Sequence, residues 1–169
     1  IGATLQLRDS ADNPTSTAIF RLGPGQINSP SSTPGFVHVS VNGNEYELQN
    51  GLYIRGRSGI QHELDICLLE RSACVYGRMH GILPAFGKVK LLIECKYYGA
   101  TLDLHLGREY VGLGTEFPLR VKALTSNEKS DSVHTLVTSH RGTTQYEVVP
   151  QDTPKCEQFI HWIASELRQ

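Results

Sequence analysis

Two β-prone apolar runs in this chain each carry charged residues, which a buried strand seldom tolerates without a partner. The first run, residues 63–69, is nearly continuous in apolar side chains but has Asp65 near its middle. The second run, residues 89–98, carries Glu94-Cys95-Lys96 where its apolar stretch ends. The first pattern predicts a strand covered on both faces, and the second predicts a strand with charged residues towards its end. A carboxylate on a covered strand needs a reason, because burying an unpaired charge is costly.

The charged residues of the second run have a defined arrangement. Side chains at i and i+2 of a strand point to the same side, so Glu94 and Lys96 share one face while Cys95 turns to the other. If the strand of Asp65 is the neighbour, a second carboxylate joins them. Two bare carboxylates repel each other, and a divalent cation keeps both ionised. Oxygen ligands favour Mg²⁺ or Mn²⁺ over zinc, and Lys96 would orient the water for phosphodiester hydrolysis.

The residues around these charges resemble a known signature. Residues 56–65 read Gly-Arg-Ser-Gly-Ile-Gln-His-Glu-Leu-Asp, and residues 93–97 read Ile-Glu-Cys-Lys-Tyr. Together they resemble the PD-(D/E)XK nuclease superfamily, and in detail the G-x-SG-x-x-H-x-x-D and IECK segments of Mrr-like restriction endonucleases. The resemblance extends from about residue 48 to residue 113. It implies an α/β fold with a restriction-endonuclease-like core, in which helices flank a central mixed β-sheet.

The resemblance also implies roles for individual residues. Asp65 and Glu94 would bind Mg²⁺ or Mn²⁺ with the backbone carbonyl of Cys95, and Lys96 would be the catalytic lysine. The implied activity is that of a metal-dependent endodeoxyribonuclease, acting in restriction or defence against foreign DNA, with DNA repair or recombination as the next choice. RNA remains open as a substrate. A catalytically silent nucleic-acid-binding or assembly module of the same fold is the alternative.

The chain departs from the family pattern in two places. Leu64 precedes Asp65 where many members have proline. No N-terminal helix carries the additional glutamate that some members use, and Glu45, Glu47 and Glu63 are the weak candidates for it.

Residues near the first motif are candidates for contacts with phosphate. His62 would contact a phosphate or, as the favoured alternative, hydrogen-bond the loop to the sheet. Arg55 and Arg57 lie in a glycine-rich segment that could approach a DNA backbone, where guanidinium groups suit phosphate oxygens, but an exposed turn explains them equally well.

Other kinds of site fit the sequence less well. An exposed ion pair between Glu94 and Lys96 would contribute under about 1 kcal/mol and would leave Asp65 unexplained. A cysteine nucleophile is not indicated, because no cysteine begins a predicted helix beside a basic cluster. The potential zinc ligands lack the close spacing of structural zinc modules; they are His62, Cys67, Cys74, His80 and Cys95.

Composition indicates one soluble domain. The chain has 169 residues, 39% of them hydrophobic, and its net charge is −1, so contact with DNA must be local. Residues 1–35, rich in Ser, Thr, Asn, Pro and Gly, are predicted to form an extension of loops or edge strands, and residues 36–169 the nuclease-like domain. No run approaches the length of a membrane helix, and the sparse cysteines suggest a reducing cytoplasm.

The patterns also predict individual elements. Asn42-Gly43-Asn44 predicts a tight hairpin turn between two strands, and apolar spacings of three and four predict helices over residues 102–113 and 155–167. Residues 133–138 and 146–149 are predicted strands, and residues 72–88 a glycine-rich connection. Because Met79 is the only methionine, we expect the chain to be a piece of a longer protein. A fused or separate recognition domain, or a homodimer partner, is expected to direct it to DNA.

Overall fold

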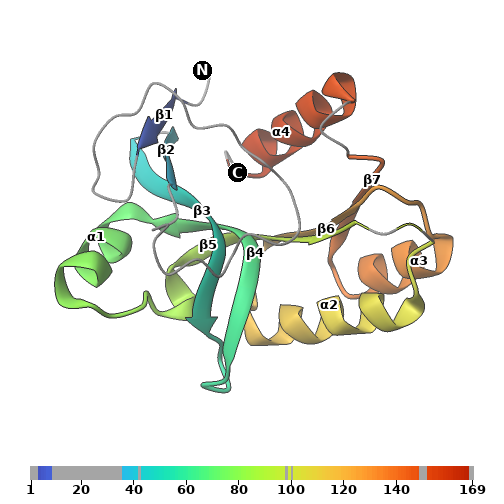
Figure 1. Ribbon diagram of the computed structural model, residues 1–169, viewed down its shortest axis with the longest axis horizontal. Coiled ribbons are helices and arrows are strands. Elements are labelled where there is room, and N and C mark those ends of the chain that lie inside the picture. Colours follow the sequence, from blue (N-terminus) through green and yellow to red (C-terminus); the bar gives the residue numbers. More distant parts are fainter. Residues whose placement is uncertain are drawn as a thin grey trace.

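A computed structural model places residues 4–8, 36–41, 43–97, 99, 101–148 and 152–167, and the description is confined to them. These residues form a mixed sheet of seven strands with helices on both faces (Figure 1). The strands are β1 (Thr4–Arg8), β2 (Phe36–Val41), β3 (Asn44–Arg55), β4 (Gln61–Glu70), β5 (Val89–Lys96), β6 (Val121–Ser126) and β7 (Thr143–Tyr146). The helices are α1 (Arg71–His80), the short 3₁₀ helix η1 (Phe86–Lys88), α2 (Leu104–Glu116), α3 (Asp131–Ser139) and α4 (Thr153–Leu167).

The strands lie side by side in chain order. Strands β1 to β5 pair antiparallel, whereas β5, β6 and β7 pair parallel because α2 and α3 cross back over the sheet between them. The predicted hairpin turn is confirmed at Gly43, whose φ of 78° favours glycine. The α/β class and the mixed sheet flanked by helices are therefore as the sequence predicts.

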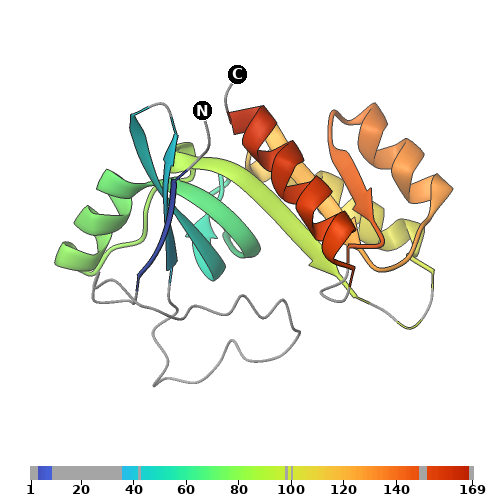
Figure 2. The ribbon, with the colours of Figure 1, turned by 90° about the horizontal axis from the view of Figure 1, so that it is seen from above.

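Alternate side chains of the parallel strands enter two separate cores. In β6, Ala123 faces α4 and packs in one cluster with Phe159. The next residue, Leu124, packs on the opposite face with Tyr110 of α2 and Val133 of α3. Figures 1 and 2 show α4 on one side of the sheet and α2 and α3 on the other. Strand β5 alternates in the same way: Leu91 and Ile93 pack on the α4 side, and Leu92 packs on the other side.

The sheet divides between β4 and β5. Their pairing ends at Ile66↔Ile93, yet β4 remains paired with β3 as far as Gln61, and β5 remains paired with β6 as far as Lys96. Beyond Ile66, therefore, β4 leaves β5 and continues with β3 as a two-stranded hairpin that projects past the rest of the sheet (Figure 1). We refer to the point of separation as the fork.

Residues 133–138, predicted as a strand, instead lie in α3, and that prediction is wrong. Val133 and Val137 are both fully buried and four residues apart, so they occupy one face of a helix. Asp131 in the first turn favours the helix through its charge. The β-branched residues suggested a strand, but tertiary packing outweighs that weak preference.

Residues 72–88, predicted as a glycine-rich connection, contain most of α1, which is a second correction. Gly77 lies inside the helix, where a Cβ would come within 2.5 Å of the carbonyl oxygen of Ile82. Gly81 ends the helix with a φ of 66°. These glycines therefore mark a close backbone approach and a helix end. No element was predicted from the sequence for Val121–Ser126, which form β6.

The two predicted helices are confirmed with shifted ends: residues 102–113 correspond to α2 and residues 155–167 to α4. The strand predicted over residues 146–149 is misplaced, because β7 ends at Tyr146 and Glu147 has a φ of 60°, which is not an extended conformation. Strand β1 lies at the edge of the sheet beside β2, whereas residues 9–35 lie outside the described part. No helix in the described ranges is long and apolar enough to cross a membrane.

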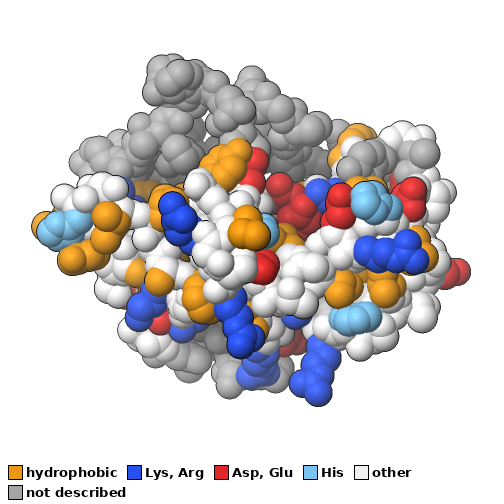
Figure 3. Space-filling view, turned by 90° about the horizontal axis from the view of Figure 1, so that it is seen from below, with side chains coloured by type: hydrophobic (Ala, Val, Ile, Leu, Met, Phe, Trp, Pro, Cys, Tyr) orange, Lys and Arg blue, Asp and Glu red, His pale blue; other side chains and the backbone are white. Residues whose placement is uncertain are grey.

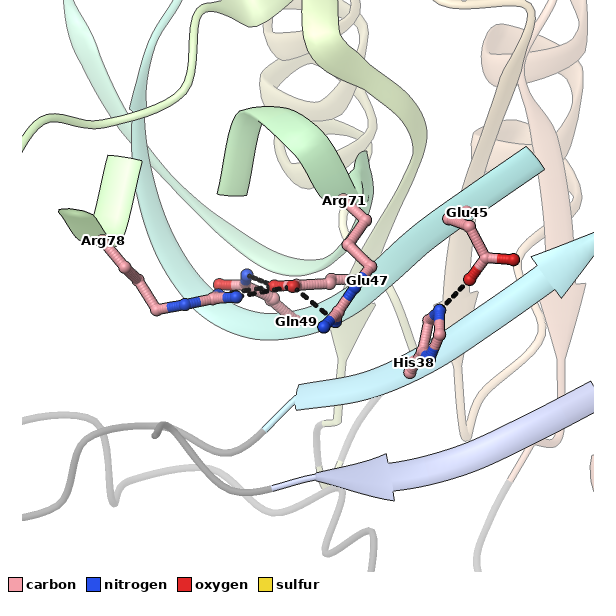
Figure 4. Close-up of polar contacts among 6 residues, drawn as sticks. All are labelled: His38, Glu45, Glu47, Gln49, Arg71 and Arg78. Carbon is pink, nitrogen blue, oxygen red and sulfur yellow. Dashed lines mark hydrogen bonds and ion pairs between the residues drawn. The ribbon is translucent and has the colours of Figure 1, made fainter. Parts of the chain in front are cut away.

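Buried charges fasten α1 to the sheet (Figure 4). The carboxylate of Glu47 on β3 is fully buried. Both terminal guanidinium nitrogens of Arg78 donate to it at 2.7 Å, and Arg71 donates at 3.0 Å. Gln49 donates a further bond at 3.0 Å, and the Arg78 guanidinium lies 4.6 Å from the centre of the Phe36 ring. A buried carboxylate is costly unless its charge is compensated, so both arginines are needed to keep Glu47 in the fold. We therefore assign them a structural role.

We expect Arg78→Ala to lower the free energy of unfolding by about 3 kcal/mol, because it leaves the Glu47 carboxylate buried and only partly compensated. Urea denaturation measures the change. Lys155→Ala is the matched control, since Lys155 forms an exposed ion pair with Glu147 at 3.1 Å, and its loss should cost less than about 1 kcal/mol. Equal effects of the two substitutions would contradict a structural role for the buried cluster.

Candidate active site

The fork positions the carboxylate of Asp65. Where the backbone pairing of β4 and β5 ends, the Oδ2 atom of Asp65 accepts a hydrogen bond from the backbone N–H of Cys95 at 2.7 Å. The side chain thus replaces a backbone acceptor and spans the opening between the strands. This contact fixes Asp65 beside the segment Glu94-Cys95-Lys96, as the sequence predicts.

The alternation along β5 directs Glu94 and Lys96 to the α2 side of the sheet. Ile93 and Cys95 pack in the core on the α4 side, so the residues between and after them project the opposite way. The Nζ atom of Lys96 donates to Oε1 of Glu94 at 2.5 Å. Their side chains are only 20% and 13% exposed, so they are not the solvated pair of the alternative interpretation.

Burial raises the energy of the two acids in their charged forms. The pKa of Asp65 is raised by desolvation, although the Cys95 N–H and the Lys96 ammonium oppose that shift. The pKa of Glu94 is raised by desolvation and then by the charge of Asp65, against the effect of Lys96. The structure therefore holds two mutually repelling carboxylates beside a single ammonium.

One oxygen of this cluster fits a cation site. Oε2 of Glu94 is buried and has no hydrogen-bond partner, an arrangement that costs free energy unless something positive approaches it. Among the described residues, no group of three or more His, Cys, Asp or Glu side chains is placed to hold a metal ion. A cation here would therefore rely on Asp65, Glu94 and a backbone oxygen, the set predicted from the sequence with the Cys95 carbonyl.

Helix α2 closes one side of the cluster. Asp103 caps the helix by accepting from the backbone N–H of His105 at 2.8 Å. Tyr110 is 3% exposed, and burial together with the charge of Glu94 raises its phenol pKa. The charge of Glu109 also raises the pKa of Glu94. Sequence reasoning gave Tyr110 no role at the site, because helical spacing cannot show that a buried ring adjoins a charged site.

The residues predicted to contact phosphate lie along the β3–β4 hairpin and not at the fork. Arg55 and Arg57 are exposed near its tip. His62 packs edge-on against Phe117 with ring centres 5.8 Å apart, and its Nε2 atom lies 3.9 Å from the Glu116 carboxylate. The ring thus packs within the hairpin, but its Nε2 atom is buried without a hydrogen-bond partner, so the predicted hydrogen bond between loop and sheet is not borne out.

The candidates for an additional glutamate have other partners. Glu47 is the buried anchor of α1, and Glu45 pairs with His38. Glu63 accepts a hydrogen bond from the hydroxyl of Tyr53 at 2.8 Å. Of the three, only Glu63 acts on the site, because its charge raises the pKa of Asp65 slightly.

Comparison with known proteins gives no relative from which a function could be transferred. No family model matches the chain. No curated protein matches it. No solved structure matches it.

Without metal, we expect Asp65→Asn to stabilise the fold by about 1 kcal/mol at pH 8, because it removes one of two repelling charges while an amide oxygen can still accept from Cys95. Raised folded-state pKa values mean that the folded protein holds protons more tightly than the unfolded chain. Stability of the parent protein therefore falls as pH rises from the ordinary carboxyl values through the raised ones.

The gain from Asp65→Asn should accordingly shrink as pH falls towards 4. Urea denaturation in EDTA at both pH values measures it. Glu63→Gln serves as the control, because Glu63 is partly exposed and lies on the hairpin, and it should change stability by less than about 0.5 kcal/mol. A loss of stability in Asp65→Asn at pH 8 would mean that the two acids do not repel each other.

Proposed function

We propose that this chain is a metal-dependent endodeoxyribonuclease domain whose active site is the fork. The observation that carries the proposal is the meeting of Asp65, Glu94 and Lys96 at one point, with a buried carboxylate oxygen left without a partner. A purely structural ion pair between Glu94 and Lys96 does not need Asp65, whose charge disfavours the ionised form of Glu94 and raises its pKa. Function therefore accounts for an arrangement that stability alone opposes.

The restriction-endonuclease-like core belongs to the same proposal. Its support is the sequence resemblance and the position of the two motifs on adjacent antiparallel strands, β4 and β5, followed by the crossover helix α2 and the parallel strand β6. A role in restriction or defence against foreign DNA rests on the resemblance.

The residues of the fork have separate tasks in this proposal. Asp65 and Glu94 would hold Mg²⁺ or Mn²⁺, with the Cys95 carbonyl as a further ligand. The ion would supply Lewis acidity to a phosphate oxygen and lower the pKa of a water. The Lys96 ammonium, held 2.5 Å from Glu94, would place a positive charge where negative charge grows during hydrolysis. Burial at the fork strengthens that interaction by keeping bulk water away.

A cleavage assay on supercoiled plasmid DNA tests the proposal. We expect cleavage with Mg²⁺ and none in EDTA, and a loss of at least about 100-fold in Asp65→Ala and in Lys96→Ala. Lys90→Ala is the matched control, because Lys90 lies on the same strand but pairs with Glu70 at 2.8 Å away from the fork; it should cleave normally. Cleavage of RNA alone would overturn the assignment to DNA.

Cation binding gives a second measurement that does not need activity. Mg²⁺ should raise the thermal unfolding midpoint of the parent protein and of Lys90→Ala, but not that of Asp65→Ala. Cleavage and cation stabilisation that persist in Asp65→Ala would discard this site.

A further inference from the structure

The projecting tip of the β3–β4 hairpin, residues 56–60, presents an unusual set of exposed side chains. Ile60 is 62% exposed at the end of a loop, where polar residues are the norm. Arg57 in the same loop is exposed, and Arg55 is exposed at the end of β3. An exposed apolar side chain with two exposed arginines within five residues of it along the chain suits a groove bordered by phosphates.

The tip is held in place by the end of α2. The backbone N–H and the hydroxyl of Ser58 both donate to Oε2 of Glu116, at 2.9 and 2.7 Å. The Arg57 N–H donates to the Glu116 carbonyl at 3.0 Å. A Cβ at Gly56 would lie 2.6 Å from the Glu116 carboxylate, so glycine is needed for this approach. These contacts give the tip a fixed direction without using the side chains of Arg57 or Ile60.

Hydrogen bonds within the loop also limit its movement. The Gly56 N–H donates to the carbonyl of Ile60 at 2.8 Å, and the Gly59 N–H donates to the carbonyl of Gly56 at 3.0 Å. Arg55 donates to the Gly59 carbonyl at 3.2 Å. Little backbone conformational entropy is therefore left to lose when the tip binds a partner, which favours affinity.

We propose that this tip is a DNA-contacting wedge, in which Arg55 and Arg57 bind backbone phosphates and Ile60 enters the groove between them. The inference rests on the proposed function and adds the element that grips the duplex. Ile60 and Asp65 are five positions apart, with four residues of β4 between them, a span of at most about 17 Å. That length corresponds to about five base pairs at 3.4 Å each, so one duplex can reach the fork and the tip together.

The surroundings of the tip agree with a local contact. Figure 3 views the molecule from the side towards which the hairpin projects. Basic, acidic and hydrophobic side chains are interspersed on this face. With a net charge of −1 for the whole chain, a general attraction to DNA is not available. A shaped contact with a few phosphates is the remaining way to bind a duplex.

The test measures binding of a labelled 24-base-pair duplex by fluorescence anisotropy in EDTA, so that cleavage cannot occur, over a series of salt concentrations. Arg57→Ala should weaken binding about tenfold and reduce the salt dependence by about one counterion. Ile60→Ser should weaken binding about tenfold without changing the salt dependence, because it removes an apolar contact. The matched controls are Lys129→Ala and Met79→Ser, whose side chains are 68% and 75% exposed.

Glu116 is a positioning residue in this proposal, and its variant adds a discriminating measurement. Glu116→Gln should weaken duplex binding in the parent protein but have no further effect in the double variant Arg57→Ala, Ile60→Ser. A residue that only stabilised the fold would weaken both proteins alike.

Three outcomes separate this inference from the proposed function. Weaker binding in both tip variants and normal binding in both controls supports the wedge. Parent-like binding in the tip variants, together with Mg²⁺-dependent cleavage by the parent protein, overturns the wedge and leaves the nuclease assignment intact; a tip that contacts another protein would give this result. A parent protein that neither binds nor cleaves the duplex overturns both.

Discussion

The hydrogen bond from the Cys95 N–H to the Asp65 carboxylate is the interaction on which the site depends. It forms where two antiparallel strands stop pairing, and it lets a side chain take over from the backbone ladder. Strand β4 can then leave β5 without exposing that N–H to an apolar core, which would be costly. The same bond brings the first acid to the second. One hydrogen bond thus both ends the pairing of the two strands and positions Asp65 in the candidate site.

Charge is distributed in this molecule in two different ways. At the far end of β4, the buried Glu47 has its charge matched by two arginines and an amide, so the cluster holds α1 in place. At the fork, two acids share one lysine, and a carboxylate oxygen is left over. The first cluster is complete in itself, whereas the second is short of positive charge. That contrast is why we treat the first cluster as structural and propose a function for the second.

The sequence was sufficient for the parts of the structure that depend on local pattern. Asn42 and Gly43 predicted the hairpin turn, and strand alternation placed Glu94 and Lys96 on one face. The neighbouring position of Asp65 was a hypothesis that required long-range pairing, and the structure confirms it. Sequence could not show that Val133 and Val137 face a helix core, because β-branched residues suit either element until their neighbours are known. Nor could it connect Glu116 with Ser58, which lie far apart in the chain and meet only because the hairpin leaves the sheet.

The most direct measurement is the anomalous diffraction of Mn²⁺ in crystals of the parent protein and of Glu94→Gln. The account predicts one strong Mn²⁺ peak in the parent, with carboxylate oxygens of Asp65 and Glu94 both within about 2.3 Å of the ion, and no peak at the fork in the variant. A fork without Mn²⁺ in the parent, or an ion bound by only one of the two acids, would contradict the claim that these carboxylates converge to share a cation.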